Sequence, residues 1–288
     1  MRCLQVKDGE GATRLALREG ERLLVLRAAH EGIATALDLL RALGEDGLDG
    51  AAWRRGAADA GALVEALPAR CTPDLPVTPA EVWGAGVTYR RSAEFREEGS
   101  GIYDQVYAAE RPELFFKATA ARCVAPGAPI GRRRDSSFTA SEAEMAVVLG
   151  AGGAVIGFTL ANDVSAWDIE RENPLYLPQS KVYRGCFAFG PVVVTPDEIG
   201  DPYALALSAR VERAGRVVFA GSAGTGQLKR RLPELVRFLL RSNVVPPGTV
   251  LSTGTGIIQP LDVGLEEGDV VTIECPAIGA LRNPVEWV

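Results

Sequence analysis

Two carboxylates stand one residue apart where an apolar run begins. Glu142 and Glu144 lie in the stretch SEAEMAVVLG, which continues without a polar break from Met145 and reads as a buried strand. Side chains at positions i and i+2 of a strand point to the same face of the sheet. The two carboxylates are therefore predicted to project together from the start of this strand.

Asp163 is predicted to join these two carboxylates across a hairpin. The strand reaches a GAGG turn, and the chain returns as AVIGFTLAND, which ends in Asp163. Folding about this turn places residue 144 near residue 159 and residue 142 near residue 161, to within roughly one or two residues. The open end of the hairpin then holds three carboxylates.

Three carboxylates in one place repel one another, and two arrangements relieve this. They can share protons, which raises a pKa, or they can bind a divalent cation. A ligand set made of oxygen suits Mg²⁺, with Mn²⁺ or Ca²⁺ as alternatives, better than Zn²⁺. Each carboxylate taken singly could be solvated at a strand end. The convergence of Glu142, Glu144 and Asp163 beside an apolar strand pair favours a metal site.

The polar segment after Asp163 is a candidate wall for a substrate pocket. NDVSAWDIERENPLYLPQSKVYRG is long and irregular and mixes polar with aromatic residues, as binding loops do. Lys181 is the lysine of this segment. It could hold a substrate carboxylate, or lose its proton near the metal and act as a base. A surface lysine is the alternative interpretation.

The composition narrows the classes of function. The chain has 288 residues, is 47% hydrophobic and carries a net charge of −6, so no nucleic-acid partner is expected, because phosphate binding needs a basic face. No apolar run approaches the roughly 18 residues that span a bilayer, so no membrane segment is expected. Five dispersed cysteines without CxxC spacing argue against a disulfide framework or a zinc site and fit a cytoplasmic protein.

Histidine chemistry is restricted to one residue. His30 is the single histidine of the chain, and the leucines that follow it at helical spacing place it near the start of a helix, as a surface or capping residue. A metal site with several histidines is therefore excluded. Ser-His-Asp or Cys-His catalysis would depend on His30.

Two segments must position these groups. Residues 1–75 are predicted to form a small N-terminal α/β domain, and the proline-rich stretch PDLPVTPAEV follows as an extended linker. Residues 76–288 read as a β-dominated catalytic domain, because short β-rich runs are separated by Gly and Pro. One amphipathic helix is predicted in QLKRRLPELVRFLLRSN, with Leu228 and Leu239 on its apolar side. The predicted fold class is α+β.

Several stretches, in order along the chain, resemble the fumarylacetoacetate hydrolase family. They are GVTY (86–89), PELFFK (112–117), SEAEM, GFTLANDVSAWD, the Lys181 region with FGPVVV, LSTGTG (251–256) and IGALRNPV (278–285). Together they extend over about residues 80 to 288 and are highly specific. The resemblance implies a mixed β-roll core with a small N-terminal domain, and a homodimer or a homotetramer built as a dimer of dimers.

The resemblance also implies roles for particular residues. It implies Mg²⁺ bound by the residues that match Glu142, Glu144 and Asp163, which the strand pattern had already grouped. Lys181 matches the family's active-site lysine. Gly254 and Thr255 lie in the STGTG turn and are assigned to substrate binding, because Thr255 matches the threonine whose neighbourhood holds the carboxylate end of the substrate.

One departure from the family pattern bears on the reaction. Carbon–carbon hydrolases that resemble this chain usually carry GxNYxxHxxE, whose His and Glu activate the attacking water. Here the stretch is GVTYRRSAEF, with Ser92 at the histidine position and Phe95 at the glutamate position. Glu94, Glu97 or Glu98 could replace the acid, but no histidine is near in sequence. This departure argues against hydrolysis.

The stretches ENPLYLPQSKVY, VTYRRS and RPELFFKA resemble the branch of the family that dehydrates 2-keto-3-deoxy pentonates. A 2-keto acid can chelate Mg²⁺, which stabilises negative charge on the keto oxygen and acidifies the hydrogens on C3. Lys181 is the first candidate for the base that removes one of them. Glu113 is the candidate partner acid or base, and a strand-edge charge is the equal alternative. Tyr89, Arg90 and Ser92 are expected to line the mouth and touch substrate hydroxyls, with solvent exposure as the alternative for Arg90.

Three interpretations of function follow. The favoured one is a Mg²⁺-dependent hydro-lyase that converts a 2-keto-3-deoxy sugar acid, such as 2-keto-3-deoxy-D-arabinonate, to 2,5-dioxopentanoate. The second is a carbon–carbon hydrolase of a diketo acid of the fumarylacetoacetate or acylpyruvate type, against which the missing histidine weighs. The third is a family member that binds metal and ligand without catalysis, against which the intact carboxylates and Lys181 weigh.

Overall fold

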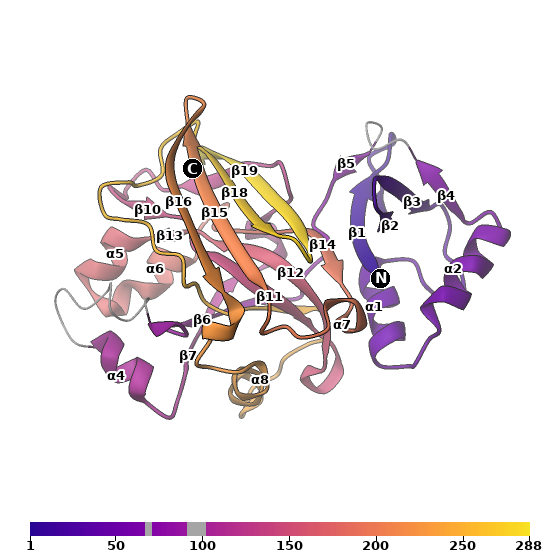
Figure 1. Cartoon of the computed structure of the whole chain (residues 1–288), viewed down its shortest axis with the longest axis horizontal. Helices are drawn as coiled ribbons and strands as arrows, with labels where there is room; N and C mark the ends of the chain where they lie inside the picture. The colour runs from indigo at the N-terminus through magenta and orange to yellow at the C-terminus, as the bar shows by residue number, and fades with distance from the viewer. Residues whose placement is uncertain (67–70, 91–101) are drawn as a thin grey trace.

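The computed structural model describes residues 1–66, 71–90 and 102–288, and β-strands dominate it (Figure 1). The predicted α+β, β-dominated fold class is confirmed. The helices are α1 (Ala36–Gly44), α2 (Gly50–Asp59), α4 (Ile102–Ala108), α5 (Trp167–Glu172), α6 (Leu177–Lys181), α7 (Pro196–Ile199) and α8 (Leu232–Leu240). The strands of the N-terminal part are β1 (Arg2–Lys7), β2 (Thr13–Glu19), β3 (Arg22–Leu26), β4 (Leu63–Ala66) and β5 (Thr72–Pro73).

The strands that follow build the rest of the molecule. They are β6 (Val82–Gly86), β7 (Glu113–Ala118), β8 (Cys123–Val124), β9 (Ile130–Arg132), β10 (Thr139–Ala140), β11 (Ala143–Leu149), β12 (Val155–Asp163), β13 (Ser165–Ala166), β14 (Phe187–Val194), β15 (Ala206–Arg213), β16 (Arg216–Gly224), β17 (Thr249–Ser252), β18 (Val270–Cys275) and β19 (Gly279–Trp287). Within the described part of the chain, no helix combines the length and the apolar character needed to span a bilayer.

The largest sheet carries the predicted carboxylates. Its strands follow the order β4-β3-β2-β1-β14-β12-β11-β17-β6-β7. The β11–β12 hairpin therefore lies inside the sheet, between β14 and β17. Strand β17 runs parallel to β6, and β6 pairs with β7 in antiparallel fashion. This order brings segments that are far apart in the sequence to the open end of the hairpin.

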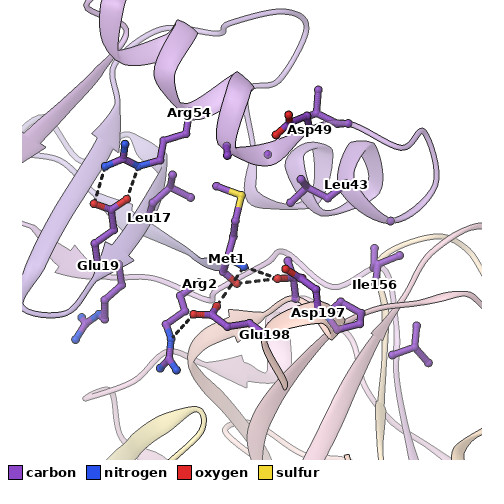
Figure 2. Close-up of a pocket in the computed structure, with 18 of the residues that line it drawn as sticks. Met1, Arg2, Leu17, Glu19, Leu43, Asp49, Arg54, Ile156, Asp197 and Glu198 are labelled. Atoms are coloured by element: carbon purple, nitrogen blue, oxygen red, sulfur yellow. Dashed lines mark hydrogen bonds and ion pairs between the residues drawn. The ribbon is translucent and has the colours of Figure 1, made fainter. Parts of the chain in front are cut away.

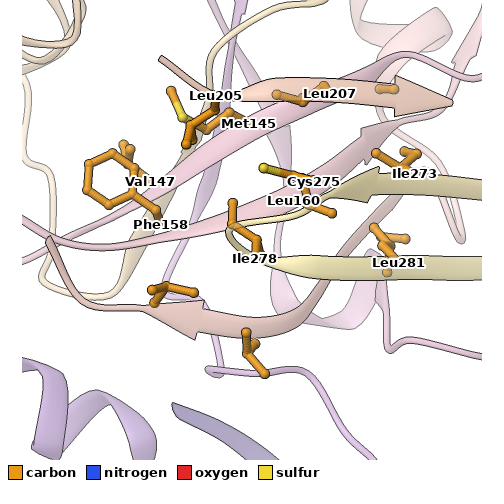
Figure 3. Packing of buried hydrophobic residues seen from close by; sticks show 14 of the residues in the cluster. Met145, Val147, Phe158, Leu160, Leu205, Leu207, Ile273, Cys275, Ile278 and Leu281 are labelled. Carbon is orange, nitrogen blue, oxygen red and sulfur yellow. The ribbon is translucent and has the colours of Figure 1, made fainter. Parts of the chain in front are cut away.

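Both faces of β11 are buried, which explains the uninterrupted apolar run from Met145 to Leu149 that follows Glu144. Met145 and Val147 belong to a core shared with the second sheet, whose strand order is β16-β15-β18-β19-β9 (Figure 3). Ala146 and Val148 face the opposite core, which includes Leu40 of α1. Successive side chains of a strand alternate between faces, so a stretch of strand that packs between two apolar cores is apolar at successive positions.

The N-terminal strands continue the same sheet. Strand β1 pairs with β14, so the hydrogen-bonded ladder runs from one predicted domain into the other. Figure 2 shows this junction, where Arg2 and the amino group of Met1 form ion pairs of 3.3 Å and 3.1 Å with Glu198 of α7. Arg54 of α2 pairs with Glu19 on the N-terminal side. The boundary at residue 75 stays a prediction.

Helix α8 is shorter than the predicted amphipathic segment. It begins at Leu232 and ends at Leu240, with Pro233 in its first turn, where a missing backbone N–H costs no helical hydrogen bond. Leu228 precedes the helix and forms an isolated β-bridge with Tyr89. The apolar side chains from Leu232 to Leu239 are buried, so the predicted inward face is correct, while Leu228 reaches the core from the preceding loop.

Candidate functional site

The three predicted carboxylates meet at the open end of the β11–β12 hairpin. Glu142 immediately precedes β11, Glu144 is its second residue, and Asp163 ends β12. One oxygen from each lies within 4.8 Å of the others, and the exposed fractions of the three residues are 4%, 2% and 1%. Such burial shows that these are not solvated carboxylates at a strand end.

The register of the hairpin differs from the predicted one by two residues. Glu144 lies opposite Ala161, not residue 159, because the 3₁₀ turn Ala151–Gly153 lengthens the loop and the ladder is irregular at Val148 and Leu149. A shift of two residues preserves the face to which each side chain points. The carboxylates therefore still converge.

Glu144 is fixed by the loop that follows β17. Its Oε2 accepts hydrogen bonds from Ser252 Oγ at 2.5 Å and from the backbone N–H of Gly254 at 2.7 Å. Gly254 has φ +90°, and a Cβ there would lie 1.9 Å from the Thr88 hydroxyl, so glycine is required. Burial, then Asp163 and Glu142, raise the pKa of Glu144 to about 8.

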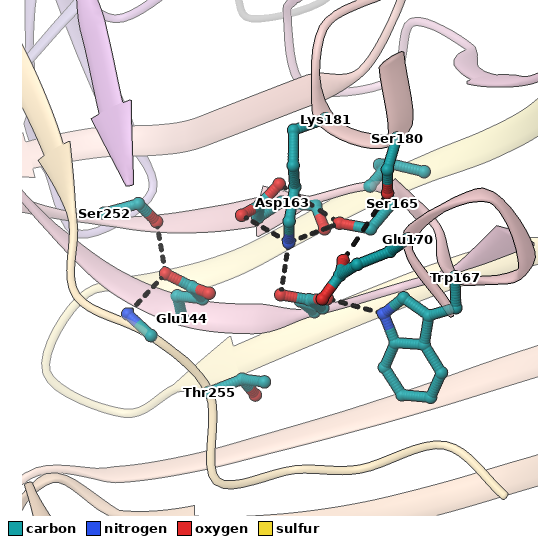
Figure 4. A network of polar contacts seen from close by, with 12 residues as sticks. Glu144, Asp163, Ser165, Trp167, Glu170, Ser180, Lys181, Ser252 and Thr255 are labelled. Atoms are coloured by element: carbon teal, nitrogen blue, oxygen red, sulfur yellow. Dashed lines mark hydrogen bonds and ion pairs between the residues drawn. The ribbon is translucent and has the colours of Figure 1, made fainter. Parts of the chain in front are cut away.

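Glu142 is held on both of its oxygens. The indole N–H of Trp167 donates to Oε1 at 2.6 Å, and Nζ of Lys181 lies 3.0 Å from Oε2 (Figure 4). Trp167 is the first residue of α5 and its ring stacks on Phe138, with 5.8 Å between ring centroids. The start of α5 therefore orients one of the predicted metal ligands.

Asp163 lies between two buried lysines. Its Oδ1 is 2.6 Å from Nζ of Lys117, and its Oδ2 is 3.2 Å from Nζ of Lys181. Lys181, the last residue of α6, also donates to Ser165 Oγ at 2.7 Å (Figure 4). The ammonium group of Lys181 thus has three oxygen partners, from Glu142, Asp163 and Ser165, which match its three N–H donors.

The donor set fits a hard divalent cation. Three buried carboxylates supply only oxygen, the ligand atom that Mg²⁺, Mn²⁺ and Ca²⁺ prefer. Two lysines leave this cluster with one negative charge in excess when all groups are ionised. Burial, together with the like charges of Asp163 and Glu142, disfavours the ionised form of Glu144 and so raises its pKa. A bound cation would relieve both effects.

A narrow pocket adjoins the carboxylates. Its lining includes Glu113, Lys181, Gly254 and Thr255 from the predicted set, together with Ala85, Gly86, Val87, Phe115, Glu142 and Glu170. Phe115 lies under Lys181, with Nζ 5.1 Å from the ring centroid. The pocket therefore brings an amine and carboxylates to one place, as proton transfer requires.

Comparison with known proteins identifies the family to which this architecture belongs. Residues 81–286 match the family model described as fumarylacetoacetate (FAA) hydrolase C-terminal. The chain belongs to the fumarylacetoacetate hydrolase family. The match covers most of the chain and includes every pocket residue named above.

Members of this family with assigned reactions are similar over most of their length. The 2-dehydro-3-deoxy-D-arabinonate dehydratase of Saccharolobus solfataricus is 49% identical over 218 residues, which are 73% of each chain. The probable 2-keto-3-deoxyxylonate dehydratase of Haloferax volcanii is 46% identical over 217 residues, which are 74% of this chain and 75% of the relative.

A solved structure of 2-keto-3-deoxy-D-arabinonate dehydratase, complexed with magnesium and 2,5-dioxopentanoate, covers 100% of this chain and 99% of its own. The TM-score is 0.83 and the sequence identity 38%. The predicted fumarylacetoacetate-hydrolase-like fold is thereby confirmed.

The residues predicted to line the mouth of the pocket differ in their exposure to solvent. Tyr89 is 3% exposed, and burial together with Glu144 raises the pKa of its hydroxyl above the ordinary range, so it keeps its proton. Arg90 is exposed. Ser92 and Phe95 lie outside the described residues. The Thr255 hydroxyl donates to the carbonyl of Ala143 at 2.7 Å, so it holds its own loop in place.

Sequence reasoning missed four residues that hold the site together. Lys117, Ser165, Trp167 and Ser252 each contact a predicted metal ligand or Lys181. Lys117 could have been noticed as a charge that interrupts the apolar run LFFKA, and Trp167 as an aromatic residue four positions after Asp163. The two serines carry no signal of this kind in a single sequence.

Proposed function

We propose that this protein is a Mg²⁺-dependent dehydratase of 2-keto-3-deoxy sugar acids. The substrate class is a pentonate such as 2-keto-3-deoxy-D-arabinonate, and the product is 2,5-dioxopentanoate. The observation that carries the proposal is the full-length similarity to a dehydratase structure that holds magnesium and this product. The buried set of Glu142, Glu144 and Asp163 supplies the site for the cation.

The reaction removes one proton and one hydroxyl group. A base takes a proton from C3, and the hydroxyl on C4 leaves as water with a proton from an acid. The double bond then moves from C3–C4 to C4–C5 as C5 loses a proton and C3 gains one, and the resulting enol tautomerises to the aldehyde. When bound, the cation stabilises negative charge that develops on the keto oxygen of the substrate. The protein's own task is to supply the base, the acid and the orientation.

Lys181 and Glu113 are the two candidates for proton transfer. Both line the pocket, and Lys181 has three hydrogen-bond acceptors around its ammonium group. In this arrangement Lys181 can give a proton to the leaving hydroxyl, and Glu113 can take one from C3. The alternative predicted from the sequence, in which Lys181 is the base, requires that Lys181 first lose a proton. Glu113→Gln and Lys181→Met variants separate these assignments.

Exchange of the C3 hydrogens with D₂O identifies the base. A variant that lacks the base should neither exchange these hydrogens nor form product. A variant that lacks the acid should still exchange them while elimination is slow. If both variants exchange normally, neither residue removes the C3 proton.

The location of His30 favours dehydration over carbon–carbon hydrolysis. Hydrolysis needs a base that activates water, and the family's hydrolytic pattern uses a histidine. His30 is the single histidine of this chain, and its ring lies 6.2 Å from that of Trp53, in the N-terminal part. It forms a β-bridge with Ile33 before α1. No histidine is therefore positioned among the pocket residues that the structure describes.

The reaction is tested with the purified protein, Mg²⁺ and 2-keto-3-deoxy-D-arabinonate. An aldehyde product should form, and EDTA should abolish its formation. Cleavage of an acylpyruvate with no action on the sugar acid would instead support hydrolysis. Tight binding of the sugar acid without turnover of either compound would support a binding protein.

We also propose a homodimer or homotetramer and a cytoplasmic location. The family resemblance supports the first. The second is supported by the five cysteines, Cys3, Cys71, Cys123, Cys186 and Cys275, all of which are free thiols. Light scattering coupled to gel filtration measures the oligomer, and fractionation of cells measures the location. A monomer in solution would contradict the first proposal.

A further inference from the structure

Lys117 is a fully buried cation at the back of the carboxylate cluster. Its side chain has an exposed fraction of 0%, and its Nζ lies 2.6 Å from Asp163 Oδ1. It also donates to the backbone carbonyl of Val164 at 2.8 Å. A buried ammonium group is costly unless it is paired and hydrogen-bonded, so these two contacts fix its position.

The strand that carries Lys117 is shaped around it. Phe116 pairs with Trp83 and Ala118 with Val82, so Lys117 is the extra residue of a β-bulge in the β6–β7 ladder. Bulges change the direction in which a side chain points and are frequent beside active sites. Two residues of the same strand, Glu113 and Phe115, line the pocket. Strand β7 therefore serves both the pocket and Asp163.

The two lysines hold Asp163 in different ways. Lys181 contacts Oδ2, but it is shared with Glu142 and Ser165 and it faces the pocket. Lys117, on β7, contacts Oδ1 and forms its ion pair with Asp163. A substrate or cation that displaces Lys181 would thus leave Asp163 still anchored through Oδ1.

We propose that Lys117 is a positioning residue that orients the Asp163 carboxylate toward a divalent cation. It acts through the 2.6 Å ion pair and is not one of the described residues that line the pocket. Groups that orient metal ligands typically contribute ~10–100-fold to metal affinity. This inference concerns cation binding, and it rests on the proposed function for the identity of the cation.

The test is a titration of the metal-free protein with Mg²⁺ in a calorimeter. Lys117→Met removes the charge and keeps the length of the side chain. It should weaken Mg²⁺ binding by about 10–100-fold. In an Asp163→Asn background the same substitution should have little further effect, because its target is already altered. A merely structural lysine would not show this dependence on Asp163.

Tyr183→Phe is the matched control. The Tyr183 hydroxyl donates to the same Val164 carbonyl at 3.1 Å, and its ring lies 5.8 Å from Lys117 Nζ. Removing this hydroxyl disturbs the same neighbourhood without removing the ion pair, so Mg²⁺ affinity should stay close to that of the unaltered protein. Urea unfolding in EDTA measures the stability of each variant.

Several results would overturn the proposal. One is that Lys117→Met binds Mg²⁺ as tightly as the unaltered protein, or more tightly. Another is that Lys117→Met weakens Mg²⁺ binding by the same factor in the Asp163→Asn background as in the unaltered protein. If Lys117→Met does not fold, Lys117→Gln takes its place, since an amide can still donate to Asp163. Failure of both to fold, with Mg²⁺ present, would make Lys117 a structural ion pair and refute the positioning role. The titration uses no substrate, so its result is independent of whether the dehydratase proposal holds.

Discussion

Glu144→Gln isolates the charge of one predicted metal ligand. The Oε2 of Glu144 accepts hydrogen bonds from Ser252 Oγ and the Gly254 N–H. The carbonyl oxygen of glutamine can accept both, and its NH₂ group takes the place of Oε1. The substitution therefore keeps the shape and these contacts while it removes the negative charge. We expect Mg²⁺ affinity to fall by more than the ~100-fold upper range for groups that orient ligands.

The effect on stability has a sign and a magnitude that follow from the structure. Burial, then the neighbouring Asp163 and Glu142, raise the pKa of Glu144 from 4.5 to about 8. A pKa raised in the folded state means that ionisation disfavours folding, so stability is lost as pH rises from about 4.5 through 8. The full cost is on the order of 5 kcal/mol above this range. Metal-free Glu144→Gln should not lose this stability, because glutamine does not ionise.

Urea unfolding in EDTA at about pH 5.5 and about pH 9 measures this cost. The unaltered protein should lose several kcal/mol more between these values than Glu144→Gln. Glu172→Gln, an exposed carboxylate on α5, is the control and should behave like the unaltered protein. The reasoning fails if the variant and the unaltered protein lose stability equally, or if Glu144→Gln binds Mg²⁺ normally in calorimetry.

Three further substitutions test other contacts of the site. Lys181→Met should abolish turnover and should destabilise the metal-free protein by about 3–5 kcal/mol, because it leaves Glu142 and Asp163 without a buried ion-pair partner; assays of activity and urea unfolding in EDTA measure the two effects, and unchanged stability would contradict the second. Gly86→Ala places a Cβ 2.0 Å from Glu113 Oε2, so it should lower kcat and leave Mg²⁺ affinity unchanged, and a normal kcat would argue against a role for Glu113. Trp167→Phe removes the donor to Glu142 and should weaken Mg²⁺ binding by about tenfold in calorimetry; unchanged affinity would make that hydrogen bond irrelevant to the cation.

The carboxylate cluster could be predicted from sequence because it depends on local geometry. The spacing of Glu142 and Glu144 fixes their shared face, and the turn between the two strands brings Asp163 back to them. The actual register differs by two residues, yet the prediction survives because side chains alternate with a period of two. An error of one residue would have sent Glu144 to the opposite face.

The supporting contacts could not be predicted because they join distant strands. Lys117 lies 46 residues before Asp163 in sequence, and its direction depends on a bulge in the pairing of β6 with β7. Neither the pairing nor the bulge leaves a pattern in one sequence. Tyr89 shows the same limit: it was predicted to line the mouth of the pocket, but it is buried and forms a bridge to Leu228 that a single sequence does not reveal.

The pairing of β6 with β7 also explains two sequence stretches that looked unrelated. Gly84 lies opposite Phe115 and Gly86 opposite Glu113, and a Cβ on either glycine would lie 2.0–2.4 Å from the facing side chain. Glycines two residues apart therefore make room for two side chains, also two residues apart, to lie across the neighbouring strand. The bulge that follows lets the same strand turn Lys117 toward Asp163. The pocket wall and the ion pair that holds Asp163 thus depend on one strand and its register, so a slip of β7 would disturb both together.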